Sequence, residues 1–342
     1  GRAVSYTGAP LDGGQVRWRV VREVRFPPWW RFRRRVVQPF PPGRGNQEIA
    51  HGRERTSADG GFRLRFAAFP DITVPAESAP IFQFRVYADV TSPTGETRSA
   101  QRVVKLGYAA LQATLTASEW QTALDPVAIR VRTSTLDGLA QAAEGVLRVY
   151  RLQQPERVLR PAWDVRGPVP REAAEGAVGT DPASWPLGGV VSEQGVTTDA
   201  DGNHTAQVEL AVGVYRAVLQ TQDRFGKPVK AELLVRVLDP AAARLSIKVP
   251  ELLAAPSWSL QPGQEFVAVW GSGYQRARAF VEIEHRGRWL ARYWTAAERT
   301  QVQIKQAIEE THRGGLSVRV TMVRENRAYL HSRKVAVPWK NK

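Results

Sequence analysis

The densest group of residues able to do chemistry is the run Trp29-Trp30-Arg31-Phe32-Arg33-Arg34-Arg35. Aromatic rings interleaved with arginine can stack on bases while the guanidinium groups neutralise phosphates. The favoured interpretation is a loop whose tryptophans plug the end of the sandwich or the next domain while the arginines face water. Polyanion binding is the alternative hypothesis. The polyanion hypothesis predicts weaker retention on heparin when the three consecutive arginines are changed to Ser.

The metal-ligand types are scattered. The histidines stand alone, without an HExxH pair or a nearby acidic cluster, at His51, His204, His285, His312 and His331. They are expected to be surface or turn residues and not metal ligands. Cysteine is absent, which excludes disulfides, thiolate metal sites and a cysteine nucleophile from this sequence.

The carboxylates also favour structural roles. Asp199-Ala200-Asp201-Gly202-Asn203 has the look of a calcium loop, but Leu210 stands where an EF-hand needs a bidentate Glu, so the segment is predicted to be a turn. Glu282 and Glu284 share a strand face with arginines, which favours cross-strand charge pairing over acid and base catalysis.

Signatures of nucleotide and acyl chemistry are missing from the sequence. There is no G-x-S-x-G elbow, P-loop or dinucleotide fingerprint, and Gly271-Ser272-Gly273 has too little around it to cradle a phosphate. We therefore expect no enzyme activity, no catalytic residues, no cofactor and no metal.

Charge is unevenly distributed along the 342 residues, whose net charge is +15. Residues 1–106 carry 18 basic and 9 acidic side chains, residues 107–241 carry 13 and 16, and residues 242–342 carry 17 and 8. Most arginines alternate along strands, so a solvated surface is favoured over an electrostatic partner such as nucleic acid, lipopolysaccharide or an acidic protein. No apolar run approaches the ~20 residues of a membrane helix. The absence of a signal peptide suggests an internal fragment, with any membrane anchor outside it.

One pattern occurs twice. Thr197 to Leu238 contains an Asp-Gly turn, extended runs and a second turn at Asp223-Arg224-Phe225-Gly226, and is predicted to be a three-stranded meander. Ser57 to Leu106 repeats it, because Gly95 falls on Gly226 when Arg85 is set on Arg216. Such repetition indicates a tandem array of similar domains.

The elements predicted around these repeats divide the chain into three antiparallel β-sandwiches, fibronectin- or immunoglobulin-like, at residues 1–106, 107–241 and 242–342. The first has strands at Gln15 to Val24 and Phe62 to Phe66 and a long loop at 25–56; the second has a proline-rich insertion at 153–195. The third begins with a strand at Leu245 to Val249. Its hairpin around His285-Arg286-Gly287 is predicted to set Glu284 opposite Arg288, and Lys305 to His312 is predicted to be briefly helical.

Several sequence segments together resemble the bacterial alpha-2-macroglobulin family, specifically its series of consecutive macroglobulin-like domains. The resemblance covers essentially the whole chain, and no single motif decides it. The residues that carry it are Tyr6-Thr7-Gly8-Ala9-Pro10-Leu11-Asp12-Gly13-Gly14-Gln15-Val16-Arg17-Trp18-Arg19-Val20, Pro28-Trp29-Trp30, His51-Gly52, Gly95-Glu96-Thr97-Arg98, Tyr150-Arg151-Leu152-Gln153-Gln154-Pro155, Trp163, Val281-Glu282-Ile283-Glu284-His285-Arg286-Gly287 and Val335-Ala336-Val337-Pro338-Trp339.

The resemblance implies part of a large periplasmic, surface or secreted protein that encloses a protease after the protease cuts a bait segment. In many members a Cys-x-Glu-Gln thioester then couples to the enzyme, but this sequence has no cysteine to carry one. The expected partners are proteases, through the full-length parent, and other domains of the same chain. The alternative is an adhesin-like surface scaffold that recognises an anionic partner.

Overall fold

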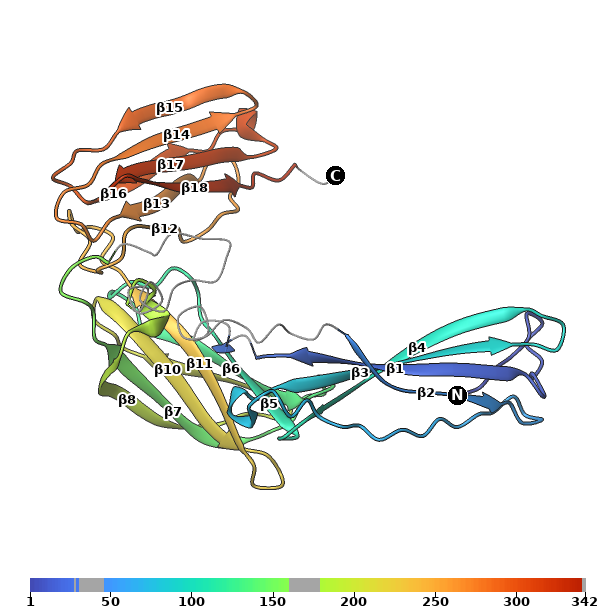
Figure 1. Ribbon diagram of the computed structural model, residues 1–342. Helices are drawn as coiled ribbons and strands as arrows, with labels where there is room; N and C mark the ends of the chain where they lie inside the picture. The colour runs from blue at the N-terminus through green and yellow to red at the C-terminus, as the bar shows by residue number, and fades with distance from the viewer. Residues whose placement is uncertain (28, 31–45, 160–178, 340–342) are drawn as a thin grey trace.

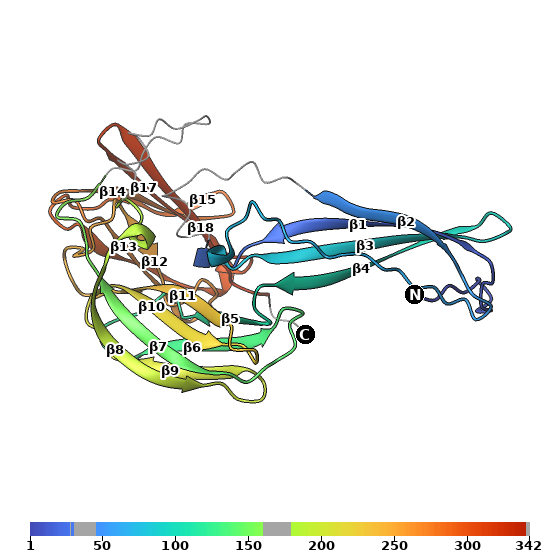
Figure 2. The same cartoon turned by 60° about the horizontal axis from the view of Figure 1, so that its bottom comes forward.

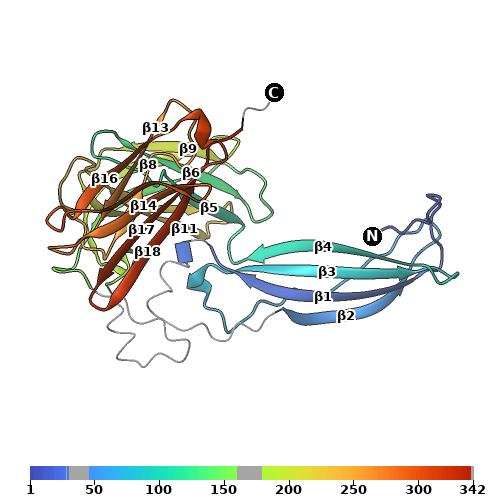
Figure 3. The same cartoon turned by 90° about the horizontal axis from the view of Figure 1, so that it is seen from above.

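The structure is a computed structural model that describes residues 1–27, 29–30, 46–159 and 179–339. The chain is all-β, as the sequence predicts, and its five sheets are built from antiparallel ladders between the named strands. Figure 1 shows three regions: the first sheet projects as a long arm from a central sandwich, and a second sandwich lies above the central one. Figures 2 and 3 show the same arm from two other sides.

The arm is a four-stranded sheet with the order β2-β1-β3-β4. Its strands are β1 (Gln15–Arg25), β2 (Gln47–Arg55), β3 (Ile81–Thr91) and β4 (Thr97–Gly107). Alternation along β1 sends Val16 and Val20 to the inner face, where both are fully buried, and Arg17 and Arg19 to the outer face. The two faces therefore have opposite chemistry, as expected of a sheet covered on one side.

The central sandwich packs a three-stranded sheet against a four-stranded one. Their orders are β5-β6-β9 and β11-β10-β7-β8. The strands are β5 (Leu111–Thr116), β6 (Val127–Thr135), β7 (Glu144–Leu152), β8 (Leu187–Thr197), β9 (Asn203–Val208), β10 (Gly213–Gln222) and β11 (Pro228–Val237). Inward residues of both sheets, such as Ile129 and Leu219, form one buried core.

The last sandwich has the same two-sheet plan, with the orders β12-β13-β16 and β15-β14-β17-β18. Its strands are β12 (Leu252–Ala254), β13 (Glu265–Gly271), β14 (Ala279–His285), β15 (Arg288–Trp294), β16 (Gln301–Ala307), β17 (Leu316–Arg324) and β18 (Arg327–Val335). Trp270 and Phe266 are fully buried between the sheets. Short 3-10 turns occur at η1 (Ala76–Ser78), η2 (Pro182–Ser184) and η3 (Glu310–His312).

The repeat seen in the sequence is a repeat of backbone geometry. The Gly60 carbonyl accepts from the Ala3 amide at 2.8 Å, and the Gly202 carbonyl accepts from the Thr133 amide at 2.8 Å. Both glycines have positive φ, 77° and 73°. A Cβ at Gly60 would lie 2.2 Å from the Ala3 carbonyl oxygen, and one at Gly202 would lie 2.0 Å from that of Thr133. Only glycine fits these two turns.

The predicted meander needs a correction. β10 and β11 form the expected hairpin, but β9 pairs with β6 in the opposite sheet. In the arm, the predicted strand Phe62 to Phe66 has no ladder, and its apolar side chains pack onto Val16, Val20 and Phe84 from an extended coil. The described residues of the first region thus form one sheet with a coil cover, where two sheets were predicted.

Both long loops were predicted too long, and for the same reason. β2 lies inside the predicted loop 25–56, and β8 begins inside the predicted insertion 153–195. Their outward and edge positions carry polar residues and glycine, so neither shows the apolar alternation that identifies a strand. β2 and β8 are strands because their backbones pair with β1 and β7, although their own sequences lack the apolar alternation.

Three details of the third region also differ from prediction. Leu245, Ile247 and Val249 are buried but lie in no strand, and their side chains fill a joint between regions. The β14–β15 turn is a two-residue loop with φ of 48° at Arg286 and 79° at Gly287, so Glu284 faces Trp289 and not Arg288. The predicted helix is β16 followed by η3, because β16 pairs with β13.

Candidate functional site

The sequence-predicted candidates for chemistry lie apart. His51 hydrogen bonds Glu48 at 3.0 Å in the arm, and His204 hydrogen bonds the Thr197 carbonyl at 3.1 Å. The rings of His285 and His312 come within 5.5 Å in the third region, a proximity that the sequence did not reveal. Within the described residues, no three His, Cys, Asp or Glu side chains gather as a metal site requires.

The acidic segment at 199–203 is a turn. The Asp199 carboxylate accepts from the Asn203 amide at 2.8 Å, and the Gly202 amide donates to the Asp199 carbonyl at 2.9 Å. Ser57 to Gly61 closes in the same way in the first copy, with Gly60 donating to the Ser57 carbonyl at 2.7 Å. Hydrogen bonding by Ser57 holds the pKa of Asp59 below its ordinary value. These oxygens serve backbone turns.

Trp29 closes the joint between the arm and the central sandwich. It is only 6% exposed and belongs to the buried core of that sandwich, with Leu111 and Val235. Trp30 packs against the same core, and its ring meets that of Trp29 edge-on at 5.9 Å. The interpretation of this run as a plug is therefore confirmed for its tryptophans, while residues 31–35 lie outside the described part.

Trp185 closes the second joint and is 1% exposed. Its Nε1 donates to the Gly179 carbonyl at 2.6 Å, and its ring packs with Leu245 and Ile247. Nearby, the Lys248 amide donates to Gln154 Oε1 at 2.8 Å. Each joint is thus filled by a tryptophan from a long connection, between β1 and β2 or between β7 and β8. Trp163, the other conspicuous tryptophan of the insertion, falls outside the described residues.

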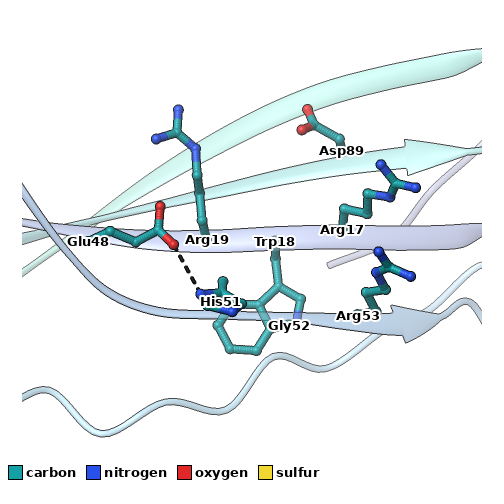
Figure 4. Close-up of a pocket in the computed structure, with 8 residues that line it drawn as sticks. All are labelled: Arg17, Trp18, Arg19, Glu48, His51, Gly52, Arg53 and Asp89. Carbon is teal, nitrogen blue, oxygen red and sulfur yellow. Dashed lines mark hydrogen bonds and ion pairs between the residues drawn. The ribbon is translucent and has the colours of Figure 1, made fainter.

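Three arginines, Arg17, Arg19 and Arg53, lie around one pocket of the arm (Figure 4). A shallow pocket of about 260 Å³ is lined by Arg17, Trp18, Arg19, Glu48, His51, Gly52, Arg53 and Asp89. β-Pairing sets Arg17 directly opposite Arg53 on one side and opposite Asp89 on the other. The Arg19 guanidinium lies 4.4 Å from the centre of the Tyr87 ring. This arrangement can hold an anion.

A half-buried titratable pair lies in the third region. Burial raises the pKa of Glu251 to about 7 and lowers the pKa of His331, whose Nε2 is 3.3 Å from Glu251 Oε1. Because the folded state holds the Glu251 proton more tightly than the unfolded state, stability is lost as pH rises from about 4.5 through 7. Both shifts favour the neutral form of the side chain, so burial favours a polar contact between uncharged groups.

The chain is similar in structure to bacterial alpha-2-macroglobulins, the family that its sequence resembles. Native alpha-2-macroglobulin of E. coli matches with a TM-score of 0.35 and 12% identity, over 98% of this chain and 21% of that chain. Salmonella alpha-2-macroglobulin reacted with methylamine matches with a TM-score of 0.33 and 12% identity, over 97% and 21%. This chain therefore spans about a fifth of their length.

A tetra-tandem repeat from the extending region of a large adhesion protein also matches, with a TM-score of 0.24 and 14% identity, over 95% of this chain and 67% of that one. No family model and no curated protein matches the sequence. Likenesses at this level of identity and superposition do not transfer a function. The arrangement of the sheets shows the β-sandwich scaffold directly.

Sequence reasoning missed the arginine face. Arg17 and Arg19 were visible as outward residues of a strand, but Arg53 lay in what was predicted to be a loop. The opposition of Arg17 and Arg53 exists only through the β1–β2 register. Gly52 was the one available signal, since a Cβ there would lie 2.7 Å from the Trp18 ring and glycine permits this close pairing.

Proposed function

We propose that this chain is a scaffold section of an alpha-2-macroglobulin-like protease inhibitor, with no enzyme activity of its own. The observation that carries the proposal is the construction of the two joints. The sandwich cores are separate clusters, and tryptophans from long connections, Trp29 and Trp185, pack at the joints between regions. Such joints can repack while each core stays intact.

In this role the sandwiches position bait and thioester elements located elsewhere in the complete protein. The absence of cysteine keeps any thioester outside these residues. After bait cleavage, the regions would rotate about their joints and close around the protease. Proteases and other domains of the same chain are the proposed partners, and the periplasm, cell surface or exterior is the proposed location. Within the described residues, no helix has the length and apolarity to span a bilayer.

The test is a caging assay on the complete protein. After incubation with a broad-specificity protease, activity is measured on a large protein substrate and on a small chromogenic peptide. Lost activity on the large substrate with the peptide still hydrolysed supports the proposal. Trp29→Ala should weaken caging, whereas Trp294→Ala, which alters a side chain that is 54% exposed, serves as the control. Equal activity on both substrates contradicts the trap for that protease.

A second candidate function is an adhesin-like surface scaffold that recognises an anionic partner. One observation favours it: Arg17, Arg19 and Arg53 line one pocket on the outer face of the arm, and Arg17 lies directly opposite Arg53. A binding assay without any protease separates this candidate from the first.

A further inference from the structure

The arginine pair at the centre of the arm's outer face is unfavourable for the fold alone. Arg17 and Arg53 are directly opposed across β1 and β2, and like charges in that position destabilise a sheet. The third region handles charge differently, because Glu282 lies opposite both Arg292 and Arg319. Removal of either arm arginine would relieve repulsion, so the pair needs an explanation outside folding.

The acidic groups nearby form no ion pair with these arginines among the described residues. Asp89 faces Arg17 across β1 and β3, but its Oδ1 accepts a hydrogen bond from Ser99 Oγ at 2.5 Å. Glu48 hydrogen bonds His51. Among the described residues, no ion pair within 4.0 Å joins Arg17, Arg19 or Arg53 to a carboxylate. The three guanidinium groups therefore keep donors for a ligand.

The spacing of these arginines suits an extended anion. Side chains two residues apart on one strand face, such as Arg17 and Arg19, are separated by about 7 Å, and neighbouring strands by about 5 Å. Arg55 continues the row along β2, opposite Gln15. The Tyr87 ring, 4.4 Å from the Arg19 guanidinium, restrains that group. Two parallel rows of donors thus follow the strand direction.

We propose that the face formed by Arg17, Arg19 and Arg53 binds tetrahedral oxyanion groups, phosphate or sulfate, carried by a linear polysaccharide. Arginine forks match such groups with paired hydrogen bonds. A glycan is favoured over single-stranded nucleic acid because bases require free aromatic platforms, and Tyr87, the tyrosine of this face, is covered by the Arg19 guanidinium. The inference names the ligand chemistry of the second candidate function and does not depend on protease trapping.

The experiment measures binding to immobilised dextran sulfate, dextran phosphate, carboxymethyl-dextran and neutral dextran. The test variant is R17S/R19S/R53S. Its matched control, R130S/R132S/R236S, removes equal charge from exposed arginines of the central sandwich. The test variant should lose at least about tenfold in affinity for the sulfated and phosphorylated polymers, and the control less than about twofold. The slope of log K against log salt should fall by about 2 to 3 in the test variant.

A second variant, R17K/R19K/R53K, keeps the charge and removes the forks, so it should bind with intermediate affinity. The melting temperature of R17S/R19S/R53S should be unchanged or higher, which shows that lost binding is not lost folding. Equal losses in the test and control variants would overturn the site, and so would wild-type binding to carboxymethyl-dextran as tight as to dextran sulfate. Tighter arginine-dependent binding of oligothymidylate of matched charge would overturn the glycan in favour of nucleic acid.

Retention of only one of the two oxyanion polymers supports the site and identifies its source as phosphate or sulfate. The caging assay is independent of this outcome. A protein that cages a protease yet ignores every dextran disproves the inference alone, and one that binds dextran sulfate through Arg17 without caging disproves the trap alone.

Discussion

The hairpin β3–β4 of the arm and the hairpin β10–β11 of the central sandwich close with the same turn. The Gly95 amide donates to the Ser92 carbonyl at 2.9 Å, and the Gly226 amide donates to the Asp223 carbonyl at 2.9 Å. Setting these glycines together also places β1 on β7 and β2 on β8, because the sheet orders are β2-β1-β3-β4 and β8-β7-β10-β11. The arm is a copy of the four-stranded sheet of the sandwich.

What differs is the inner face of the hairpin's second strand. On β11, Val229 and Ala231 are buried beneath β5. The matching residues of β4, Arg98 and Ala100, are exposed, and Arg102 occupies the place of Leu233. The backbone hydrogen bonds of the turns are the same in both copies, whereas the inner face is apolar only where another sheet covers it. Different residues therefore specify the fold and stabilise the core.

The largest expected effect tests the shared turn. Gly202→Ala should destabilise the protein by more than about 3 kcal/mol, because a Cβ at 2.0 Å from the Thr133 carbonyl oxygen forces the sandwich apart at a positive φ. Gly60→Ala meets the same clash but should leave the sandwich's own unfolding transition unchanged. Urea unfolding followed by tryptophan fluorescence measures both. Equal shifts of the sandwich transition would contradict the independence of the two copies.

Trp29→Ala tests the connection between the copies and should cost about 3 kcal/mol, since it leaves a cavity in a packed core. The expected signs are a lower denaturation midpoint for the central sandwich and faster proteolytic cleavage near the joint. Trp339→Ala, at a side chain that is 60% exposed, is the control. A normal midpoint with a loosened joint would show that Trp29 holds the arm without supporting the core.

Thr198→Val removes a hydroxyl that accepts from the Ala143 amide at 2.8 Å and contacts Thr133 Oγ1 at 2.7 Å. The buried amide loses its partner, so we expect a loss of about 2 kcal/mol in the free energy of unfolding. The equivalent Thr56 accepts from the Gly14 amide at 2.8 Å, and Thr56→Val should affect the arm alone. Hydrogen exchange of these two amides distinguishes the two predictions. Unchanged protection of the Ala143 amide in the Thr198→Val variant would disprove the role of this hydroxyl.

Much of the β-sheet architecture was predictable from the sequence, and the elements that were predicted wrongly have physical explanations. The turns that end at Gly95 and Gly226, together with β-branched runs, identified both hairpins, because turn chemistry and alternation are local properties. The crossing of β9 to the other sheet and the coil at Phe62 to Phe66 depend on long-range pairing that local alternation does not encode. β2 was missed because Gly52 and Arg53 carry no apolar signal.

The candidate site was also only partly predictable from the sequence. That Trp29 could plug a core was foreseeable from an apolar ring in a proline-rich loop, though not which core it fills. The arginine face required the β1–β2 register. The residue types indicated which side chains could bind an anion. Only the pairing of β1 with β2 showed which of these side chains lie together.

The smallest expected effect on stability comes from giving β4 of the arm the apolar side chains found at the matching positions of β11. Arg98→Val with Arg102→Leu gives β4 the side chains that match Val229 and Leu233 of β11. Because these positions are exposed in the arm, the free energy of unfolding should change by less than about 0.5 kcal/mol. The new apolar face should instead promote self-association, visible by sedimentation velocity. R130V/R132L, on β6, controls for general stickiness. A gain above about 1 kcal/mol without association would mean that the arm already buries this face, and the proposed difference between the copies would fail.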